Sequence, residues 1–266
     1  MPPVSFSMIS SETNPRVRRI RRLQSSRRVR LNDARFVVEG PRLLVEGLSA
    51  GYIPELLFFT EEWAADSDNQ ALLNQEDLEG VQSFQVTAKV MELCSDTETP
   101  QGVLAVFPLP IVPPTDEPSL MLILDGIATP GNAGTLLRSA AAARVDLVLF
   151  APGTVDPFNP KVVRGGMGAH FRLPIQRATW HRIEAMVMST QCWLAEAEVG
   201  KSCYQVDWNK PTTLIIGGET KGLSYNARSL TSDSVHIPMP GGSESLNAAV
   251  AGSVILFEIV HQRAQG

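Results

Sequence analysis

The stretch from Ile237 to Asn247, IPMPGGSESLN, combines residue types that can hold a ligand in a loop. Its prolines and glycines exclude a helix or a central strand, because proline lacks a backbone donor and glycine is conformationally loose. The loop therefore carries unpaired backbone groups, and Ser243, Ser245 and Asn247 can each cap the apolar helix expected from Leu246 to Val260. Two interpretations stay open from composition: an ordinary strand–turn–helix connection, or a loop that binds a ligand.

A second set of chemically active side chains follows Asn14 and Pro15, which resemble a helix N-cap and the first helical residue. Val17, Ile20 and Leu23 have the spacing of an apolar helix face. The arginines between them, with no lysine, favour phosphate, since guanidinium groups bind it through forked hydrogen bonds. A merely solvated helix face is the alternative. The residues expected to contact RNA are Arg16, Arg18, Arg19, Arg21, Arg22, Arg27 and Arg28.

Charge is distributed unevenly along the chain. The first 42 residues hold ten arginines against Glu12, Asp33 and Glu39, which makes +7 and leaves −12 for the rest of a chain whose net charge is −5. An acidic protein with a strongly basic beginning usually has a polyanionic partner for that segment.

Length and composition limit the possible classes of protein. A chain of 266 residues with 44% hydrophobic and 19% charged residues is typical of a soluble globular protein of one large or two ordinary domains. We expect no membrane-spanning segment and no secretory signal. Neither the three cysteines nor the four histidines have metal-ligand spacing, so we expect no metal, reduced thiols and a cytoplasmic location.

The elements that would position these residues alternate between strands and helices, which predicts α/β architecture with largely parallel sheets. We expect a disordered N-terminus over 1–13, a small α/β RNA-binding domain over 14–107, a proline-rich linker over 108–118 and a second α/β domain over 119–266. The first domain has expected strands at 36–40, 53–60, 83–87 and 102–108.

In the second domain, strands are expected at 119–126, 146–150, 171–175, 192–196, 213–219 and 235–239. A helix of sequence TLLRSAAAARV should follow the loop TPGNAG. Ligands of open α/β sheets bind at the carboxyl ends of the strands. The site should therefore be built from the loops after Leu124, Ile216 and Ile237.

Three stretches, GIATPGNAGTLLR, IIGGETKGLS and IPMPGGSESLNAAVA, together with KVVRGGMGAHFRLPI between the first two, resemble the SpoU–TrmH family of RNA 2′-O-ribose methyltransferases. The resemblance extends over the whole chain, since NPRVRRIRRL and FVVEGPRLL are similar to that family's N-terminal RNA-binding domain. It implies a SPOUT-class catalytic domain with a mostly parallel sheet and a trefoil knot, S-adenosylmethionine as cofactor, RNA as substrate and a homodimer.

The resemblance also assigns roles to individual residues. Arg138 would engage the target ribose and its phosphate, and Asn132 would orient the ribose or brace the loops. Glu219 would pair with Arg138 or with loop amides, and Ser245 and Asn247 would lie near the reacting centre. The cofactor would be bound by Gly217, Gly218, Gly222, Ile237, Met239 and Leu246.

The implied chemistry is transfer of a methyl group to a ribose 2′-hydroxyl. Because the pKa of arginine lies above about 12, Arg138 is better suited to anchor a phosphate than to remove a proton. Ribosomal RNA is the favoured substrate, with tRNA as the alternative. A non-catalytic RNA-binding or ribosome-assembly factor of the same fold is a further alternative. A dinucleotide-dependent enzyme is disfavoured, because no GxGxxG segment follows a first strand.

Overall fold

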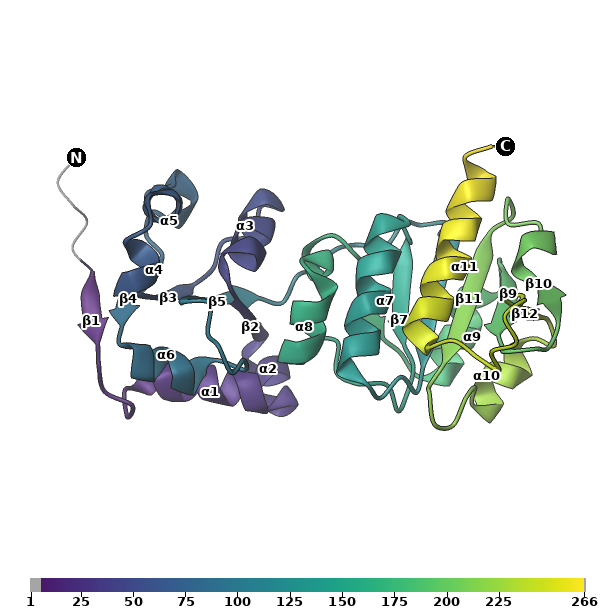
Figure 1. The fold of residues 1–266 in the computed structure, drawn as a ribbon, viewed down its shortest axis with the longest axis horizontal. Coiled ribbons are helices and arrows are strands. Elements are labelled where there is room, and N and C mark those ends of the chain that lie inside the picture. The colour runs from purple at the N-terminus through teal and green to yellow at the C-terminus, as the bar shows by residue number, and fades with distance from the viewer. Residues whose placement is uncertain (1–5, 266) are drawn as a thin grey trace. The chain divides into compact units, whose positions relative to one another are not determined.

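The computed structural model describes residues 6–265, which form two compact units (Figure 1). Unit 1 contains the described residues up to Pro110 together with Phe158–Phe171, and unit 2 contains Ile111–Pro157 and the chain from Arg172 onward. The chain thus leaves unit 1 within the predicted linker and returns to it once.

The sheet of unit 1 has five strands within residues 6–265, in the order β1-β4-β3-β5-β2. The expectation of a largely parallel sheet is wrong here: β5 runs antiparallel to both of its neighbours, and the pairings of β4 with β1 and β3 are parallel. The strands are β1 (Ser7–Ile9), β2 (Arg35–Glu39), β3 (Leu56–Thr60), β4 (Gln82–Val86) and β5 (Val103–Pro108).

Both faces of this sheet are covered, because alternate residues of a strand point to opposite sides. On β3, Leu57 and Phe59 face one apolar core, and Leu56 and Phe58 face the other. The helices are α1 (Pro15–Ser25), α2 (Arg27–Asp33), α3 (Pro41–Ser49), α4 (Glu61–Ala64), α5 (Ser67–Leu73), α6 (Ala88–Cys94) and α8 (Pro160–Gly166).

The N-terminal segment is more ordered than its composition suggested. Ser7–Ile9 form β1 within the range expected to be disordered, and Ile9 is buried; residues 1–5 lie outside the described part. The predicted helix start is confirmed, because the Asn14 side chain accepts a hydrogen bond from the Arg16 amide at 2.9 Å. Parallel pairing with β4 explains the order of β1, since it satisfies backbone groups at a sheet edge.

The segment Phe158–Phe171 belongs to unit 1 although the sequence placed it in the second domain. Val163 of α8 and Phe171 join the apolar cluster that contains Phe36 and Phe107, and the Phe107 and Phe171 rings lie 5.1 Å apart. The strand predicted over 171–175 is therefore wrong: Phe171 ends a 3-10 turn, and β8 begins only at Ile175, after Pro174.

Unit 2 contains a seven-stranded sheet within the described chain, in the order β10-β12-β9-β11-β6-β7-β8, and its pairings are all parallel. All six residues of β6 are buried, as expected for a continuous apolar strand at the middle of a parallel sheet. The strands are β6 (Leu120–Asp125), β7 (Leu147–Phe150), β8 (Ile175–Arg177), β9 (Gln191–Ala195), β10 (Lys201–Ser202), β11 (Thr212–Gly217) and β12 (Ser234–His236).

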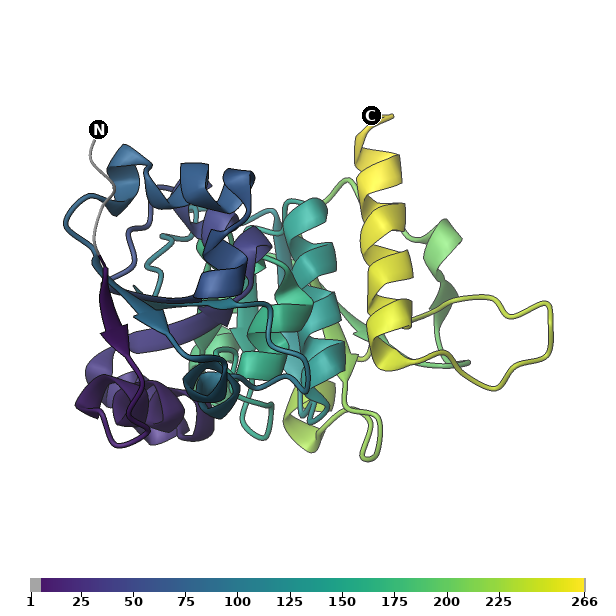
Figure 2. The same ribbon diagram turned by 60° about the vertical axis from the view of Figure 1, so that its left-hand side comes forward.

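Two helices that are distant in sequence, α7 (Pro130–Ala142) and α11 (Ala248–Arg263), lie side by side in unit 2 (Figures 1 and 2). The Ser139 and Ser253 hydroxyls are 2.7 Å apart. A Cβ atom on Gly252 would lie 2.5 Å from Leu136, so this glycine permits the close approach. The other described helices of the unit are α9 (Trp180–Val187) and α10 (Tyr225–Leu230).

Two predictions about these helices need correction. The helix expected from Thr135 begins at Pro130, because proline at the first helical position loses no hydrogen bond. The C-terminal helix is only partly buried, since 46% of Val250 and 50% of Phe257 are exposed. No helix within residues 6–265 has the length and apolarity needed to cross a membrane.

Candidate active site

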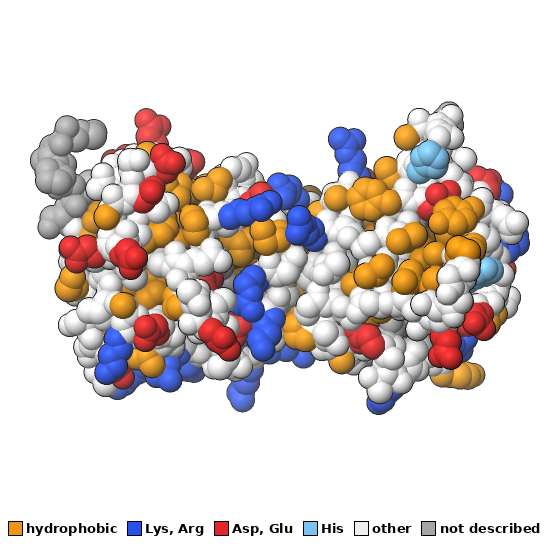
Figure 3. Space-filling model, viewed as in Figure 1, with side chains coloured by type: hydrophobic (Ala, Val, Ile, Leu, Met, Phe, Trp, Pro, Cys, Tyr) orange, Lys and Arg blue, Asp and Glu red, His pale blue; other side chains and the backbone are white. Residues whose placement is uncertain are grey.

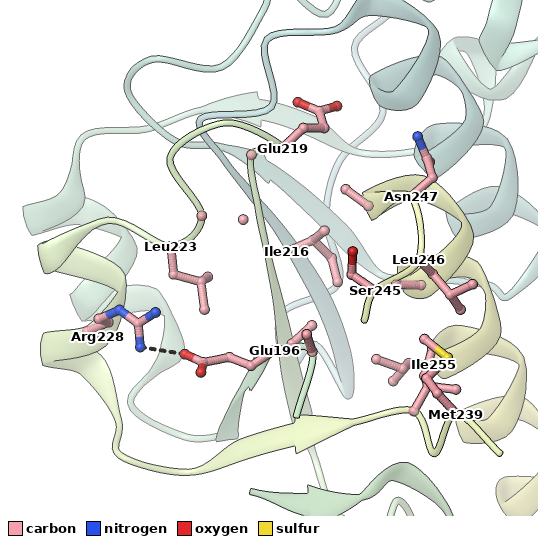
Figure 4. A pocket seen from close by; sticks show the side chains of 18 residues that line it. Glu196, Ile216, Glu219, Leu223, Arg228, Met239, Ser245, Leu246, Asn247 and Ile255 are labelled. Carbon is pink, nitrogen blue, oxygen red and sulfur yellow. Dashed lines mark hydrogen bonds and ion pairs between the residues drawn. The ribbon is translucent and has the colours of Figure 1, made fainter. Parts of the chain in front are cut away.

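A pocket of about 580 Å³ opens in unit 2 where β9, β11 and β12 end and α11 begins (Figure 4). This is the carboxyl edge of the parallel sheet, as predicted, and the expected loops after Ile216 and Ile237 line the pocket. The loop after Leu124 does not line it, and Ala195–Ala197 at the end of β9 do. Nine of the eleven residues proposed in this half of the chain line it: Gly217, Gly218, Glu219, Gly222, Ile237, Met239, Ser245, Leu246 and Asn247.

The glycines after β11 are required by the backbone of the chain itself. The Gly218 amide donates to the Asp125 carbonyl at 2.9 Å, and the Gly222 amide donates to the Gly218 carbonyl at 2.8 Å. A Cβ on Gly218 would lie 2.3 Å from the Gly126 carbonyl oxygen, and one on Gly217 would lie 2.7 Å from the Gly222 backbone. Gly222 has φ +63°. These contacts hold the second loop tightly against the end of β6.

A buried carboxylate fastens the same loop. Asp125, only 2% exposed, accepts a hydrogen bond from the Ser224 amide at 2.6 Å. The Thr154 hydroxyl accepts from the Gly126 amide at 3.0 Å and donates to the Leu124 carbonyl at 2.6 Å. Asp125 was not among the predicted site residues, although an acidic residue that ends a wholly apolar strand is a usable signal.

Three of the predicted catalytic residues form a continuous chain of hydrogen bonds. The Asn247 side-chain amide donates to the Asn132 carbonyl oxygen at 3.1 Å, and the Asn132 amide donates to the Glu219 carboxylate. The Asn247 oxygen accepts from the first amides of α11, at 2.9 Å from Ala249 and 3.3 Å from Val250. This series of hydrogen bonds joins α7, the second loop and the start of α11, and it fixes the orientation of the Asn132 and Asn247 side-chain amides.

The other two predicted catalytic residues are placed differently. Ser245 is exposed and lines the pocket from the third loop, which extends from the sheet in Figure 2. Arg138 is exposed, lies two turns into α7 and does not line the pocket. Of the two partners considered for Glu219, the structure shows neither Arg138 nor loop amides but Asn132.

The pocket also contains a charged pair that was not predicted from the sequence. Glu196, directly after β9, forms an ion pair with Arg228 of α10, and both line the pocket. Figure 4 places this pair at one end of the pocket and Glu219 and Asn247 at the other. Glu196 ends the predicted strand CWLAE, so its position at a carboxyl edge could have identified it.

The arginines of α1 divide into engaged and free groups. Arg16 lies 4.5 Å from the centre of the Phe84 ring, and Arg19 pairs with Asp33 and Glu55. Burial disfavours the Glu55 carboxylate, but hydrogen bonds from Arg35 and Arg19 outweigh burial and hold the pKa of Glu55 below its ordinary value. Among the exposed arginines of α1 and α2, the guanidinium groups that form no hydrogen bond or ion pair with residues 6–265 are those of Arg18, Arg21, Arg22, Arg27 and Arg28.

The cysteine thiols and the side chains that could bind a metal are the remaining reactive groups of residues 6–265. No group of three or more histidine, cysteine or acidic side chains in this part of the chain could hold a metal ion. Cys94, Cys192 and Cys203 are free. Burial raises the pKa of the Cys94 thiol to about 12 and is the main cause that raises the pKa values of Cys192 and Cys203. Burial therefore favours the neutral form of all three thiols over the thiolate.

Comparison with known proteins identifies the family. A model of the SpoU rRNA Methylase family matches residues 119–257, and a model of the MRM3-like substrate binding domain matches residues 14–105. The chain belongs to the SpoU family. SpoU relatives include human mitochondrial rRNA methyltransferase 3, which is 31% identical over 88% of this chain and 69% of its own length.

Two further SpoU relatives match nearly the whole chain. The 23S rRNA (guanosine(2553)-2′-O)-methyltransferase RlmP of Bacillus subtilis is 27% identical over 96% of this chain and 99% of its own. The crystal structure of the SpoU methyltransferase AviRb from Streptomyces viridochromogenes in complex with AdoMet has a TM-score of 0.81 and is 28% identical, covering 95% and 99% of the two chains.

Proposed function

We propose that this SpoU-family protein transfers a methyl group from S-adenosylmethionine to a ribose 2′-hydroxyl of ribosomal RNA. The observation that carries the proposal is the hydrogen-bonded chain of Asn132, Glu219 and Asn247 at the mouth of a pocket built by three loops. The names of the relatives, which specify rRNA and 2′-O-methylation, support it.

The residues that line the pocket suit the cofactor. A volume of about 580 Å³ lies in the range of roughly 300–1,000 Å³ of small-molecule sites. Ile216, Leu223, Met239 and Ile255 supply apolar walls for adenine and the methionine chain. The loop residues Gly217, Gly218, Gly222, Ile237 and Leu246 would complete this binding surface. When bound, the cofactor supplies an activated methyl group.

The side chains of the protein align the ribose with the methyl donor and stabilise charge. Asn132 and Asn247 hold each other and Glu219 in fixed orientations, so that the ribose meets preset polar groups. Glu219 retains a carboxylate oxygen outside this hydrogen-bonded chain, which can accept the hydrogen bond of the 2′-hydroxyl. Ser245 adds a hydroxyl at the same rim. Arg138 has no partner within the described residues and anchors the neighbouring phosphate.

Unit 1 would bind the RNA through its free arginines, and Figure 3 shows Lys and Arg side chains along the edge where Figure 1 places α1 and α2. Residues 14–107 then form the RNA-binding domain, 108–118 the linker and 119–266 the catalytic domain, with Phe158–Phe171 of the last packed on the first unit. Transfer to tRNA and a non-catalytic role in ribosome assembly are the alternatives to be tested.

The proposal includes a homodimer and a trefoil knot. Val250 and Phe257 leave an apolar face of α11 exposed, Leu246 just before the helix is exposed too, and Figure 3 shows hydrophobic side chains gathered over this helix. A second copy would cover that face, because a monomer seldom exposes a contiguous apolar patch without a partner. The three free thiols support a reducing, cytoplasmic location.

The test is incubation of the protein with labelled S-adenosylmethionine and separate rRNA and tRNA pools, followed by mapping of 2′-O-methylated riboses. Transfer to rRNA alone supports the proposal, and transfer to tRNA alone supports the alternative substrate. Transfer to neither pool, with cofactor binding intact in calorimetry, would identify a non-catalytic RNA-binding protein.

A further inference from the structure

Unit 1 contains a groove of about 560 Å³ between α1 and the C-terminal end of α6. Arg18, Arg21 and Arg22 form one wall, and their i, i+3, i+4 spacing places them on one face of α1. Leu93 and Asp96 lie on the opposite wall. The groove belongs wholly to unit 1 and shares no residue with the candidate active site.

The three arginines of this wall form no ion pair with an acidic side chain of residues 6–265. Arg16 and Arg19 have side-chain partners within the domain, whereas the guanidinium groups of Arg18, Arg21 and Arg22 are exposed and form no hydrogen bond or ion pair with residues 6–265. Like charges one turn apart on a helix repel each other. An anionic ligand would remove this repulsion, and a phosphodiester suits the guanidinium forks.

The opposite wall has different chemistry and is held in place. The Asp96 carboxylate accepts a hydrogen bond from the Arg164 guanidinium at 3.3 Å, and the Asp96 backbone amide donates one to the Glu39 carboxylate at 3.3 Å. Its second carboxylate oxygen has no hydrogen-bond partner in the described chain and therefore remains an acceptor. Half-buried Leu93 adds an apolar surface next to it. This wall would repel a second phosphate and attract a group that carries N–H donors.

We propose that this groove holds one unpaired nucleotide of the RNA substrate, with its phosphate on the three arginines and the amino edge of its base toward Asp96. The inference rests on the proposed RNA substrate and specifies the feature that unit 1 recognises. Proteins read RNA sequence mainly on unpaired bases, whose edges and faces are accessible. Cytosine offers an N4 amino donor where uracil offers an O4 acceptor, so the groove should prefer cytidylate to uridylate.

The first test compares two variants of the full chain that lose the same charge. Arg21→Gln/Arg22→Gln removes part of the groove wall, and Arg27→Gln/Arg28→Gln removes two exposed arginines outside it. The probes are short oligocytidylate, oligouridylate and an RNA duplex of equal length. We expect the groove variant to bind oligocytidylate about tenfold more weakly and to lose its preference over the duplex. The control variant should weaken all three probes alike, by about threefold.

The second test is Asp96→Asn, which replaces a pure acceptor by a group that can also donate. The wild-type preference for oligocytidylate over oligouridylate should disappear or reverse, while total affinity changes little. Equal binding of duplex and single strands by the wild type would overturn the inference. So would an identical response of the two arginine pairs, or a cytidylate preference that survives Asp96→Asn. Unchanged thermal unfolding of the variants excludes a folding defect as the cause.

Methyl transfer to rRNA and S-adenosylmethionine affinity, measured on the same proteins, separate this inference from the proposed function. Absence of transfer by a wild type that still prefers oligocytidylate counts against the proposed function alone. Normal transfer with no discrimination among the three probes counts against the groove alone.

Discussion

The arginine helix α1 and the loops of the pocket both hold chemically active residues, but the role of each residue is determined in a different way in the two regions. On α1, arginines of identical type have different roles: Arg16 and Arg19 brace the domain, and Arg21 faces an open groove. In the loops, Asn132 and Glu219 are 87 positions apart and meet through a single hydrogen bond. On the helix, residue type alone does not show which role each arginine has. In the loops, the position of a residue directly after a strand does predict which other residues it will meet.

This difference has a physical origin. A helix presents side chains in every direction, so the role of an arginine depends on what packs beside it. A parallel sheet brings the ends of its strands to one edge, so residues that follow strands are brought together by topology. Substitutions in the loops should therefore act on the reaction, and most substitutions on α1 should act on RNA affinity or stability.

The largest expected effect comes from Arg138 of α7. Arg138→Ala should lower the turnover of methyl transfer by about a hundredfold, because it removes an anchor for the phosphate. S-adenosylmethionine affinity should stay the same, since Arg138 does not line the pocket. Single-turnover transfer and calorimetry measure the two quantities. Near-full activity of Arg138→Lys would show that the forked geometry of the guanidinium is unnecessary.

The second largest effect should come from Gly218→Ala. The new methyl group would meet the Gly126 carbonyl at 2.3 Å, so the loop must shift. We expect a loss of about 1–3 kcal/mol in unfolding free energy, as for other overpacked sites, and cofactor affinity reduced by about tenfold. Urea unfolding and calorimetry check both.

Gly241→Ala is the matched control, because a Cβ there meets nothing within 4 Å. It should change stability by less than about 0.5 kcal/mol. If the two variants behaved alike, the close backbone approach at Gly218 would not be what makes glycine necessary.

Much of the fold could be predicted because its strongest signals are local. The apolar runs that became β6 and β11 are long and uninterrupted, and the glycines and prolines after them mark where each strand ends. The same signals located nine pocket residues at one edge of the sheet. The antiparallel course of β5 leaves no comparable mark, because strand direction depends on long-range pairing.

Other features depend on contacts that composition does not encode. Val163 and Phe171 look like residues of the second domain until the aromatic cluster around Phe36 is seen. Asp125 and Glu196 are single acidic residues at strand ends, and their importance appears only when Ser224 and Arg228 lie beside them. The sequence around a single charged residue does not identify the residue that it contacts in the fold.

A smaller effect is expected at Asn247, which both caps α11 and donates to Asn132. Asn247→Ala should cost about 1 kcal/mol of unfolding free energy, typical of a lost N-cap. It should also lower methyl transfer severalfold, because Asn132 loses its orientation. Asn247→Asp separates the two roles: aspartate caps equally well but has no amide to donate, so stability should recover and activity should not.

The smallest expected effect lies on the arginine helix, at Glu55, and it depends on pH. Because Arg35 and Arg19 hold its pKa below the ordinary 4.5, the paired carboxylate stabilises the fold fully above that value and loses this contribution as pH falls through the lower folded pKa. Glu55→Gln should therefore be less stable than wild type at pH 7, by at most about 1 kcal/mol for a partly exposed pair. This difference in unfolding free energy should narrow as the pH falls below 4.5. Urea unfolding at pH 7 and at a series of lower pH values measures it, with RNA affinity at pH 7 as the control. A difference in unfolding free energy that stayed constant with pH would mean that Glu55 acts through packing and not through its charge.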